Sequence, residues 1–378
     1  MLYRGMRYCL CNYFIEVLIS YEESNYMNVN SPNIKSLLTQ SLSQMFLTDR
    51  LIHFIDEEGI SKLLQSMRRF TIEDAIETFQ RKLGYKLQDR VRLRMAKAII
   101  DLLHECEYLE KNNEFYLWID GKSIETKLST DEFKVAKETF KGQVDFFEKC
   151  IMYADRFLNG NPPLYSFDSN STEIWEEFLG NAEFRFARSV LINLLFSGRD
   201  DNANVLALCY GPGFDILQMQ EQYPIKVTAL DFKDIFQRQA SSRIVNPKSV
   251  KWIKSELWKG FGTPLPFNDC TFDIVFFTCA DPYIPEDSRD YVYRDIFRVL
   301  KSKGILGILT RSYPDVERKF VKDSFVRRGT LCHDFSESVC EGWYGFYHAH
   351  DSLNLFKAIG YRIDTVMLNA SVWRLDKP

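Results

Sequence analysis

The stretch that decides the fold reads Val205-Leu-Ala-Leu-Cys-Tyr-Gly-Pro-Gly-Phe-Asp215. Its apolar first half predicts a buried strand, and its two glycines predict a tight turn into a helix over 216–222. Glycine allows a ligand to approach the backbone where a side chain would collide. The helix that follows offers unpaired N–H groups to an anionic group. The stretch therefore predicts a strand–turn–helix unit with a ligand at the turn.

Similar units recur through the second half of the chain. Short apolar runs at 205–209, 226–229, 250–253, 272–277 and 305–310 alternate with helical segments. This alternation is typical of a mostly parallel sheet built from βαβ units, which places the chain in the α/β class. Two last runs, 361–368 and 370–375, predict a closing hairpin around Asn369.

The first half of the chain is mainly helical. Apolar periodicity predicts helices over 34–46, 47–64, 71–83 and 90–106, and Asn112-Asn113 predicts a hairpin after them. This order is that of a winged helix. A long helix is expected over 131–158, a linker at Asn159-Gly-Asn-Pro-Pro163, and a further helix over 172–196.

Composition excludes several classes of protein. The chain has 378 residues, is 46% hydrophobic and carries a net charge of −4, which excludes disorder and argues against nucleic-acid binding through bulk charge. Its nine cysteines form no C-x-x-C pair and suit a reducing, cytoplasmic location. The apolar run at 13–19 is too short to span a membrane. Residues 1–26 are interpreted as a gene-start artefact or an extra helix.

Four motifs carry a family resemblance. In order along the chain they are Gly211-Pro-Gly213, Asp231, Pro264-Leu-Pro-Phe267 with Phe272-Asp-Ile-Val275, and Arg298-Val-Leu-Lys-Ser-Lys-Gly304. Together they resemble the class I S-adenosylmethionine-dependent methyltransferases, over about residues 200–378. The resemblance implies a Rossmann-like, seven-stranded sheet and methyl transfer from S-adenosylmethionine to a small, aromatic or lipophilic molecule by in-line displacement.

The winged-helix pattern resembles the N-terminal dimerisation domain of small-molecule O-methyltransferases. The expected organisation is an extension (1–33), a winged-helix domain (34–125), a connecting helix and linker (126–163) and a methyltransferase domain (164–378). A homodimer is expected, built from the apolar helices that flank the winged helix. No membrane association is expected, and the acidic residues that interrupt the basic surface argue against nucleic acid as a partner.

Cofactor-binding residues follow from the same motifs. An acid at the end of the second strand, Asp231, can accept hydrogen bonds from a ribose diol, and we expect it at an exposed strand end. The resemblance places Glu256 and Leu257 at the adenine, and Phe277 and Thr278 near the methionine portion. The full expected set is Tyr210, Gly211, Gly213, Asp231, Phe232, Glu256, Leu257, Phe277 and Thr278.

The sequence departs from the family pattern at the first motif. Ala207 stands where the family has an acid, and Cys209 stands where it has its first glycine. Ser302 and Lys303 replace a Pro-Gly pair in the later turn. These losses favour a rival interpretation, a methyltransferase-like scaffold or winged-helix regulator without turnover.

Candidate bases and acceptor contacts are less well defined. Related O-methyltransferases place a histidine after the strand at 272–277, but this chain has Asp281 there instead. His348 and His350 share one side of an extended segment and are the other candidate bases; no metal site is expected, because no matching ligand spacing lies nearby. Aromatic and basic residues are expected to line the acceptor pocket, namely Trp175, Phe178, Tyr283, Arg311, Tyr313, Trp343 and Tyr347.

Overall fold

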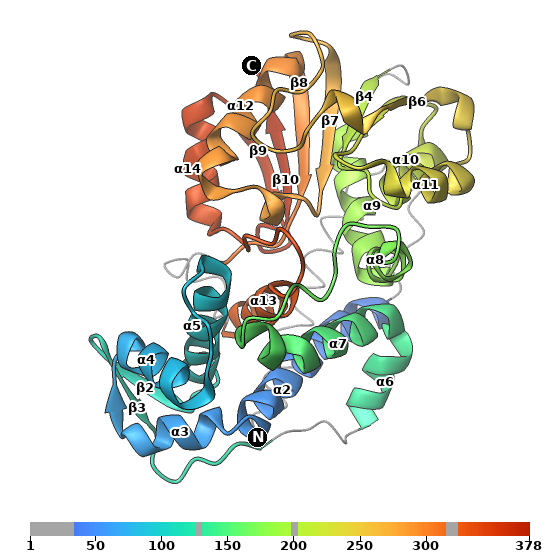
Figure 1. Ribbon diagram of the computed structural model, residues 1–378. Coiled ribbons are helices and arrows are strands. Elements are labelled where there is room, and N and C mark those ends of the chain that lie inside the picture. The colour runs from blue at the N-terminus through green and yellow to red at the C-terminus, as the bar shows by residue number, and fades with distance from the viewer. Residues whose placement is uncertain (1–33, 126–130, 198–202, 315–323) are drawn as a thin grey trace.

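A computed structural model describes residues 34–125, 131–197, 203–314 and 324–378 (Figure 1). The expected N-terminal extension, residues 1–33, lies outside them. The described chain forms a helical N-terminal part below and a sheet with helices on both faces above (Figure 1).

The N-terminal part follows the predicted order with shifted boundaries. The elements are α2 (Ile34–Glu57), α3 (Ile60–Met67), β1 (Arg69–Phe70), α4 (Ile72–Leu83), α5 (Arg90–Glu105), β2 (Leu109–Asn112) and β3 (Phe115–Trp118). The strands pair antiparallel in the order β1-β3-β2. The predicted break near residue 46 is wrong, because the helix continues to Glu57 and ends where Gly59 adopts a left-handed φ of 69°.

Four helices connect this part to the sheet. They are α6 (Asp131–Thr139), α7 (Lys141–Leu158), α8 (Thr172–Leu179) and α9 (Ala182–Phe196). We expected two long helices here, but each is broken once. Asn181 caps α9 by accepting the N–H of Phe184 at 3.1 Å, so the chain restarts its helix after Gly180. No helix among the described residues is long and apolar enough to cross a membrane.

The sheet has seven strands, and the predicted α/β fold class is confirmed. Their order is β6 (Val250–Ile253), β5 (Lys226–Leu230), β4 (Asn204–Leu208), β7 (Phe272–Thr278), β8 (Leu300–Leu309), β10 (Val372–Asp376) and β9 (Arg362–Met367). All neighbours pair parallel except β10, which is antiparallel to both β8 and β9. The predicted closing hairpin is therefore present as β9 and β10.

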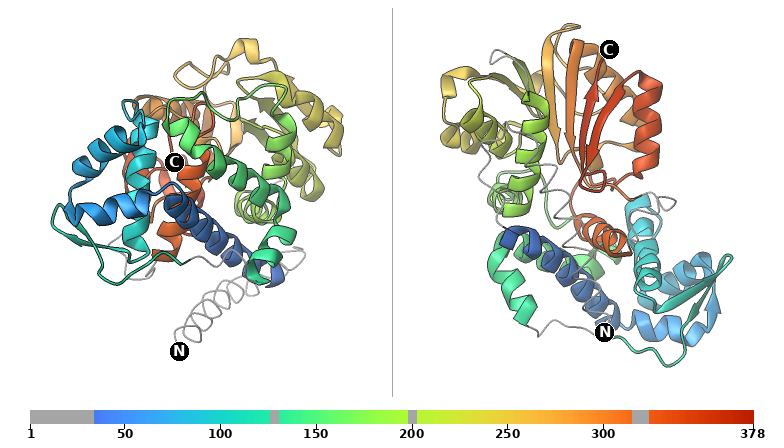
Figure 2. Two further views of the ribbon diagram at one scale, coloured as in Figure 1. Left: turned by 60° about the horizontal axis from the view of Figure 1, so that its bottom comes forward. Right: turned by 180° about the vertical axis from the view of Figure 1, so that it is seen from behind.

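Helices cover both faces of the sheet (Figure 2). One face carries α9, α10 (Phe214–Gln222) and α11 (Gln237–Arg243), and the other carries α12 (Arg289–Val299) and α14 (Ala349–Ile359). Along β7 the side chains alternate, so that Ile274 and Phe276 join the core of the first face and Val275 and Phe277 that of the second. This double burial explains why the strands are apolar throughout.

One helix of the C-terminal half lies between the two parts of the molecule. Helix α13 (Ser324–Glu337) packs against α5, α2 and α7, below the edge of the sheet (Figure 1). The loops that leave the carboxyl ends of β7 and β8 reach the same place. The position of α13 therefore brings residues of both halves to the edge where parallel sheets bind ligands.

The prediction that the helices flanking the winged helix expose an apolar surface for a homodimer is wrong. Nearly all the apolar side chains of α2 and α7 that we expected to be exposed are buried within a single chain, namely Phe46, Leu47, Leu51, Ile52, Phe54, Ile55, Phe140, Val144, Phe146, Phe147 and Ile151. Helix α13 packs against both α2 and α7. Met152 of α7, which also belonged to the predicted dimer surface, is exposed, at 69%. Homodimer formation stays a prediction, without this argument for it.

Candidate active site

The glycine turn after β4 has one open and one filled position. A Cβ at Gly211 would meet nothing nearer than Leu179 Cδ1 at 4.0 Å, whereas a Cβ at Gly213 would lie 2.5 Å from Ala240 Cβ. Both glycines have positive φ, 46° and 82°. Gly211 therefore leaves room for a ligand against the backbone, and Gly213 allows α10 to pack closely on α11.

Asp231 supports this turn from the end of β5. Its Oδ2 accepts the N–H of Gly211 at 2.9 Å, and its Oδ1 accepts the N–H of Phe232 at 2.8 Å. Our prediction that Asp231 lies at an exposed strand end is wrong, because the residue is only 3% exposed. A carboxylate has about four acceptor positions, so beside its backbone partners Asp231 can still accept a hydrogen bond from a ribose hydroxyl.

Burial also changes the ionisation of Asp231. It raises the pKa of this carboxyl to about 7, against the backbone hydrogen bonds from Gly211, Phe232 and Lys233, which lower it. A ribose diol donates to the ionised carboxylate, so ligand binding favours loss of the proton. Below pH 7 that proton must be removed on binding, which weakens the complex.

We expect Asp231→Asn to weaken S-adenosylmethionine binding by about 1–3 kcal/mol, because a charged acceptor is lost. The affinity of the native chain should fall between pH 8 and pH 6, whereas that of the variant should not. Titration calorimetry at both pH values measures this, with Glu221→Gln, an exposed change on α10, as control. Because Asp231 is buried and holds Gly211, the variant should also melt at a lower temperature. Equal affinities of native and variant chains would place the ribose elsewhere.

The other expected cofactor residues divide into buried and exposed groups. Tyr210 packs edge-on against Trp252, and Phe277 lies in the second core against Phe261 and Tyr293, so both rings favour a structural role. Phe232 is half-buried. Glu256 and Leu257 are exposed in a short helical turn, Ser255–Leu257, and Leu257 is 63% exposed. An exposed leucine beside this edge suits contact with a planar base.

The family's missing acid and glycine have visible consequences. Cys209 takes the left-handed conformation, φ 58°, which glycine adopts without strain. Further along the chain from Ala207, Asp215 of α10 accepts a hydrogen bond from Thr278 and lies 3.5 Å from Arg188. Thr278 thus holds a buried acid at the methionine end of the expected site.

A buried His–Glu pair stands on α13. His333 Nε2 is hydrogen-bonded to Oε1 of Glu337, one turn further along the helix, and both side chains are nearly inaccessible. Burial lowers the pKa of His333 well below its usual value and raises the pKa of Glu337 well above its own. His333 Nδ1 makes no hydrogen bond. The imidazole is therefore neutral, and one of its nitrogens is unused.

Charged and polar groups from other elements surround this pair. The charge of Arg311, which follows β8, acts on both members, and Arg311 itself binds Glu183 of α9 at 3.0 Å. Tyr283, in the turn after β7, lies beside Glu337: the charge of Glu337 acts on its hydroxyl, and that hydroxyl in turn lowers the pKa of Glu337. Of the expected substrate contacts, Tyr283 and Arg311 are thus brought to one place.

Asp281, His348 and His350 do not join this cluster. Asp281 is buried and accepts hydrogen bonds from Arg289 at 3.2 Å and from Tyr293 at 2.5 Å, which favours a structural role over that of a base. The prediction that His348 and His350 lie in one extended segment is wrong. Helix α14 begins at Ala349, so His348 precedes the helix and His350 lies in its first turn. Among the described residues, no group of three or more His, Cys, Asp or Glu side chains could hold a metal ion.

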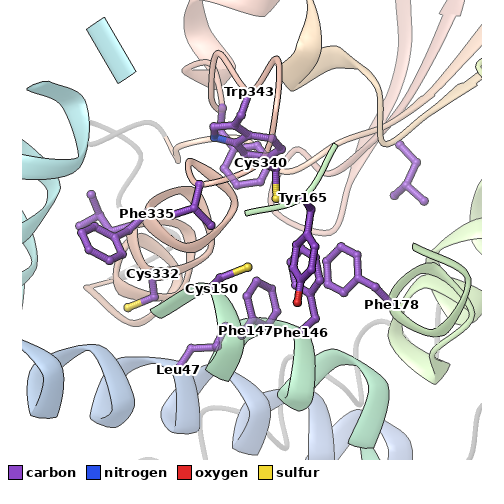
Figure 3. Packing of buried hydrophobic residues seen from close by; sticks show 14 of the residues in the cluster. Leu47, Phe146, Phe147, Cys150, Tyr165, Phe178, Cys332, Phe335, Cys340 and Trp343 are labelled. Carbon is purple, nitrogen blue, oxygen red and sulfur yellow. The ribbon is translucent and has the colours of Figure 1, made fainter. Parts of the chain in front are cut away.

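The remaining aromatic candidates for substrate contacts are held by ring contacts or hydrogen bonds within the protein. Figure 3 shows Phe178 beside Phe146 and Tyr165 below Trp343; the rings of Phe146 and Phe178 stack at 4.1 Å. Trp175 stacks on Phe167 in the same cluster. Tyr313 and Trp343 both donate to Asp334, and Tyr347 donates to the carbonyl of Ile284. These contacts favour packing roles for Trp175, Phe178, Tyr313, Trp343 and Tyr347.

Sequence reasoning gave His333 no role. The available signal was a histidine and a glutamate four residues apart, a spacing that puts both on one face of a helix. The same spacing occurs at His53 and Glu57 of α2, where the pair is partly exposed to solvent. Spacing therefore does not distinguish the buried pair from the surface pair.

The fold is that of the class I methyltransferases, and sequence comparison points to the same class. Residues 205–304 match a family described as a methyltransferase domain. The chain is also 33% identical, over 111 residues, to a demethylmenaquinone methyltransferase of Lactobacillus johnsonii; the match covers 29% of this chain. It spans 44% of that relative, less than half its length. Residues 205–304 of the chain thus match a methyltransferase domain.

Solved structures similar to this one extend over nearly the whole chain. The CurJ carbon methyltransferase has a TM-score of 0.65 at 11% identity, covering 92% of this chain and 93% of that one. The methyltransferase domain (CMeT) of the citrinin polyketide synthase has 0.58 at 15% identity, covering 96% and 94%. An O-methyltransferase family 2 protein from Planctomyces limnophilus, complexed with apigenin, has 0.52 at 10% identity, covering 94% and 98%. At these identities the likeness establishes the fold alone.

Proposed function

We propose that the chain is an S-adenosylmethionine-dependent methyltransferase that methylates an acidic carbon of a small, mostly apolar molecule. The observation that carries this proposal is the buried His333–Glu337 pair, whose free nitrogen lies at the carboxyl edge of the sheet beside Arg311 and Tyr283. Two of the structural neighbours named above are carbon methyltransferases or contain such a domain, which supports carbon over oxygen as the acceptor.

The cofactor site is formed by residues after β4, β5 and β6. Asp231 would hold the ribose, the open face of Gly211 would admit the cofactor against the backbone, and Leu257 would contact the adenine. Bound S-adenosylmethionine would supply an electrophilic methyl group for in-line displacement by the acceptor. This chain needs no nucleophile of its own for such a transfer.

His333 is the base in this proposal. A carbon acid must lose a proton to become nucleophilic, and a neutral imidazole with a free nitrogen can accept it. With Glu337 ionised, Nε2–H donates to its carboxylate and leaves the Nδ1 lone pair free. The positive charge of Arg311 would then stabilise the carbanion or enolate formed, because burial strengthens charge interactions.

We further propose that residues 34–125 form a winged-helix domain and that the chain is a homodimer. The order α3-β1-α4-α5-β2-β3 and the antiparallel sheet support the first statement. The rival interpretation, a scaffold without turnover, is favoured by Ala207 and by the left-handed Cys209. It predicts that the chain neither binds S-adenosylmethionine nor transfers its methyl group.

Two measurements test the enzymatic proposal. Titration calorimetry with S-adenosylmethionine and with S-adenosylhomocysteine is expected to give saturable binding of both. Incubation with ¹³C-methyl-labelled cofactor and acetoacetanilide, a small aromatic molecule with an acidic carbon, should then place the label on the carbon between the carbonyls by NMR. Absence of binding would favour the scaffold, and label on oxygen would correct the acceptor atom.

The pH dependence of the reaction should report the His333–Glu337 pair. At low pH the pair holds two protons, and it becomes a base when it loses one. Because burial raises the pKa of Glu337, this loss occurs well above the usual range of a carboxyl. We expect kcat/KM to rise with pH, by up to about tenfold per pH unit, until it reaches a plateau. The titratable and charged groups that act on the pair or feel its charge are Arg311, Asp334, Tyr283, Cys279 and Cys340.

Glu337→Gln provides the check on this assignment. The amide cannot ionise, and burial keeps His333 neutral to a pH well below its usual pKa. The rise of kcat/KM with pH should therefore be absent above pH 6. The plateau value of kcat/KM should fall, because the imidazole has lost its charged partner. A rise that persists unchanged in the variant would assign it to another group.

A further inference from the structure

One buried amide on α7, a helix that packs against α13, has an unused acceptor. Gln143 of α7 is 1% exposed, and its Oε1 has no hydrogen-bond partner. Its Nε2 donates to Oε2 of Glu183 at 2.8 Å. The amide cannot be turned over, because Oε1 would then face a carboxylate. Gln143 therefore presents a buried oxygen that requires a donor.

A second unpartnered polar atom lies on α13. It is Nδ1 of His333, which is 4% exposed. The two atoms belong to helices that pack against each other, α7 and α13. Buried polar atoms in folded proteins are almost always paired, so unpaired atoms gathered in one place indicate a missing ligand.

Two series of contacts connect Gln143 to His333, the proposed base. Phe147, one turn after Gln143 on α7, packs edge-on against His333 with the ring centroids 4.8 Å apart. On the other side, Gln143 binds Glu183, and Glu183 binds Arg311, whose charge acts on His333. Both connections link Gln143 to residues that contact His333 or act on it electrostatically.

We propose that Gln143 selects the methyl acceptor, by accepting a hydrogen bond from an amide N–H or a hydroxyl close to the carbon that is methylated. This proposal rests on the proposed function and narrows its substrate class. A donor-bearing acceptor satisfies Oε1, whereas an acceptor with an ether or ester oxygen there leaves it unpaired and adds a repulsive contact. Glu183 and Arg311 hold the amide in the selective orientation.

The test compares two probes that differ in one group. Acetoacetanilide has an N–H where phenyl acetoacetate has an ester oxygen, and both have the same acidic carbon and ring. Titration calorimetry on the full chain should give at least about tenfold tighter binding of the anilide, as expected when one buried hydrogen bond discriminates. Gln143→Met, similar in volume, should bind both probes with the affinity that the native chain has for the ester.

Two controls keep the outcome interpretable. Gln220→Met changes a half-buried glutamine of α10 that binds Ser249 at 2.8 Å, and it should retain the preference for the anilide. Gln143→Asn withdraws the oxygen by one methylene and should lose the preference, in case Gln143→Met does not fold. Equal or absent binding of both probes by the native chain, or a preference that survives both changes at residue 143, overturns the proposal. A preference without label transfer would leave the subsite standing and overturn the proposed function.

Discussion

Replacing His333 with glutamine is expected to lower kcat for methyl transfer to acetoacetanilide by about 10²- to 10⁴-fold, the usual contribution of a general base. Glutamine can still donate a hydrogen bond to Glu337, so the local packing is largely retained. It has no lone pair of comparable basicity to accept a proton from carbon. The affinity for S-adenosylmethionine should not change, because Asp231 and Gly211 belong to other loops.

The chain provides a matched control for this substitution. His53 and Glu57 of α2 form the same i,i+4 pair, and their side chains are 38% and 53% exposed. His53→Gln should leave kcat unchanged, because that pair lies outside the cluster around Arg311. A His333→Gln variant that keeps its rate within about threefold of the native value would show that another group removes the proton.

The sheet could be predicted because its signals are local. Each strand is a short apolar run, and the turn at Gly211 and Gly213 follows directly from the sequence. Helix boundaries were less predictable. The break at Gly180 and Asn181 depends on one cap, and a continuous apolar pattern over 172–196 hides it.

The candidate site was only partly predictable for a different reason. Asp231 was identified from its place after a strand, but its burial depends on how the loop of Gly211 closes over it. The His333 cluster draws on α7, α9, α13 and the loops after β7 and β8, which lie far apart in the sequence. No short pattern contains such a set, so only the folded chain reveals which histidine is buried beside an arginine.

Asp334, the neighbour of His333, connects the two halves of the molecule. Arg94 of α5 binds its Oδ2, and Tyr313 donates to the same oxygen at 2.6 Å. Arg94 also donates to the carbonyls of Tyr344 and Phe346, the latter at 3.1 Å. A Cβ at Gly345 would lie 1.4 Å from Arg94 Nη1, so only a glycine there lets the guanidinium lie against the backbone.

Replacing Arg94 with methionine is expected to lower the free energy of unfolding by about 3–5 kcal/mol, because a buried carboxylate loses its positive partner. The side chain of Asp334 is 2% exposed, so water cannot take the place of the guanidinium. Methionine also cannot donate to the two carbonyls. Urea denaturation of the full chain measures the loss, with Lys97→Met, an exposed change on the same helix, as control.

A second substitution separates the ion pair from the packing around it. In the Arg94→Met background, Asp334→Asn removes the uncompensated charge and should restore part of the lost stability, although alone it should be destabilising. If Arg94→Met costs no more than Lys97→Met, the pair does not hold the two halves together. If it costs as much as expected but Asp334→Asn restores nothing, the stabilisation comes from the carbonyls of Tyr344 and Phe346 instead. Either result would show that the charge on Asp334 does not fix the position of α13. It would also contradict the argument that the ion pair with α5 helps to fix the helix that carries His333.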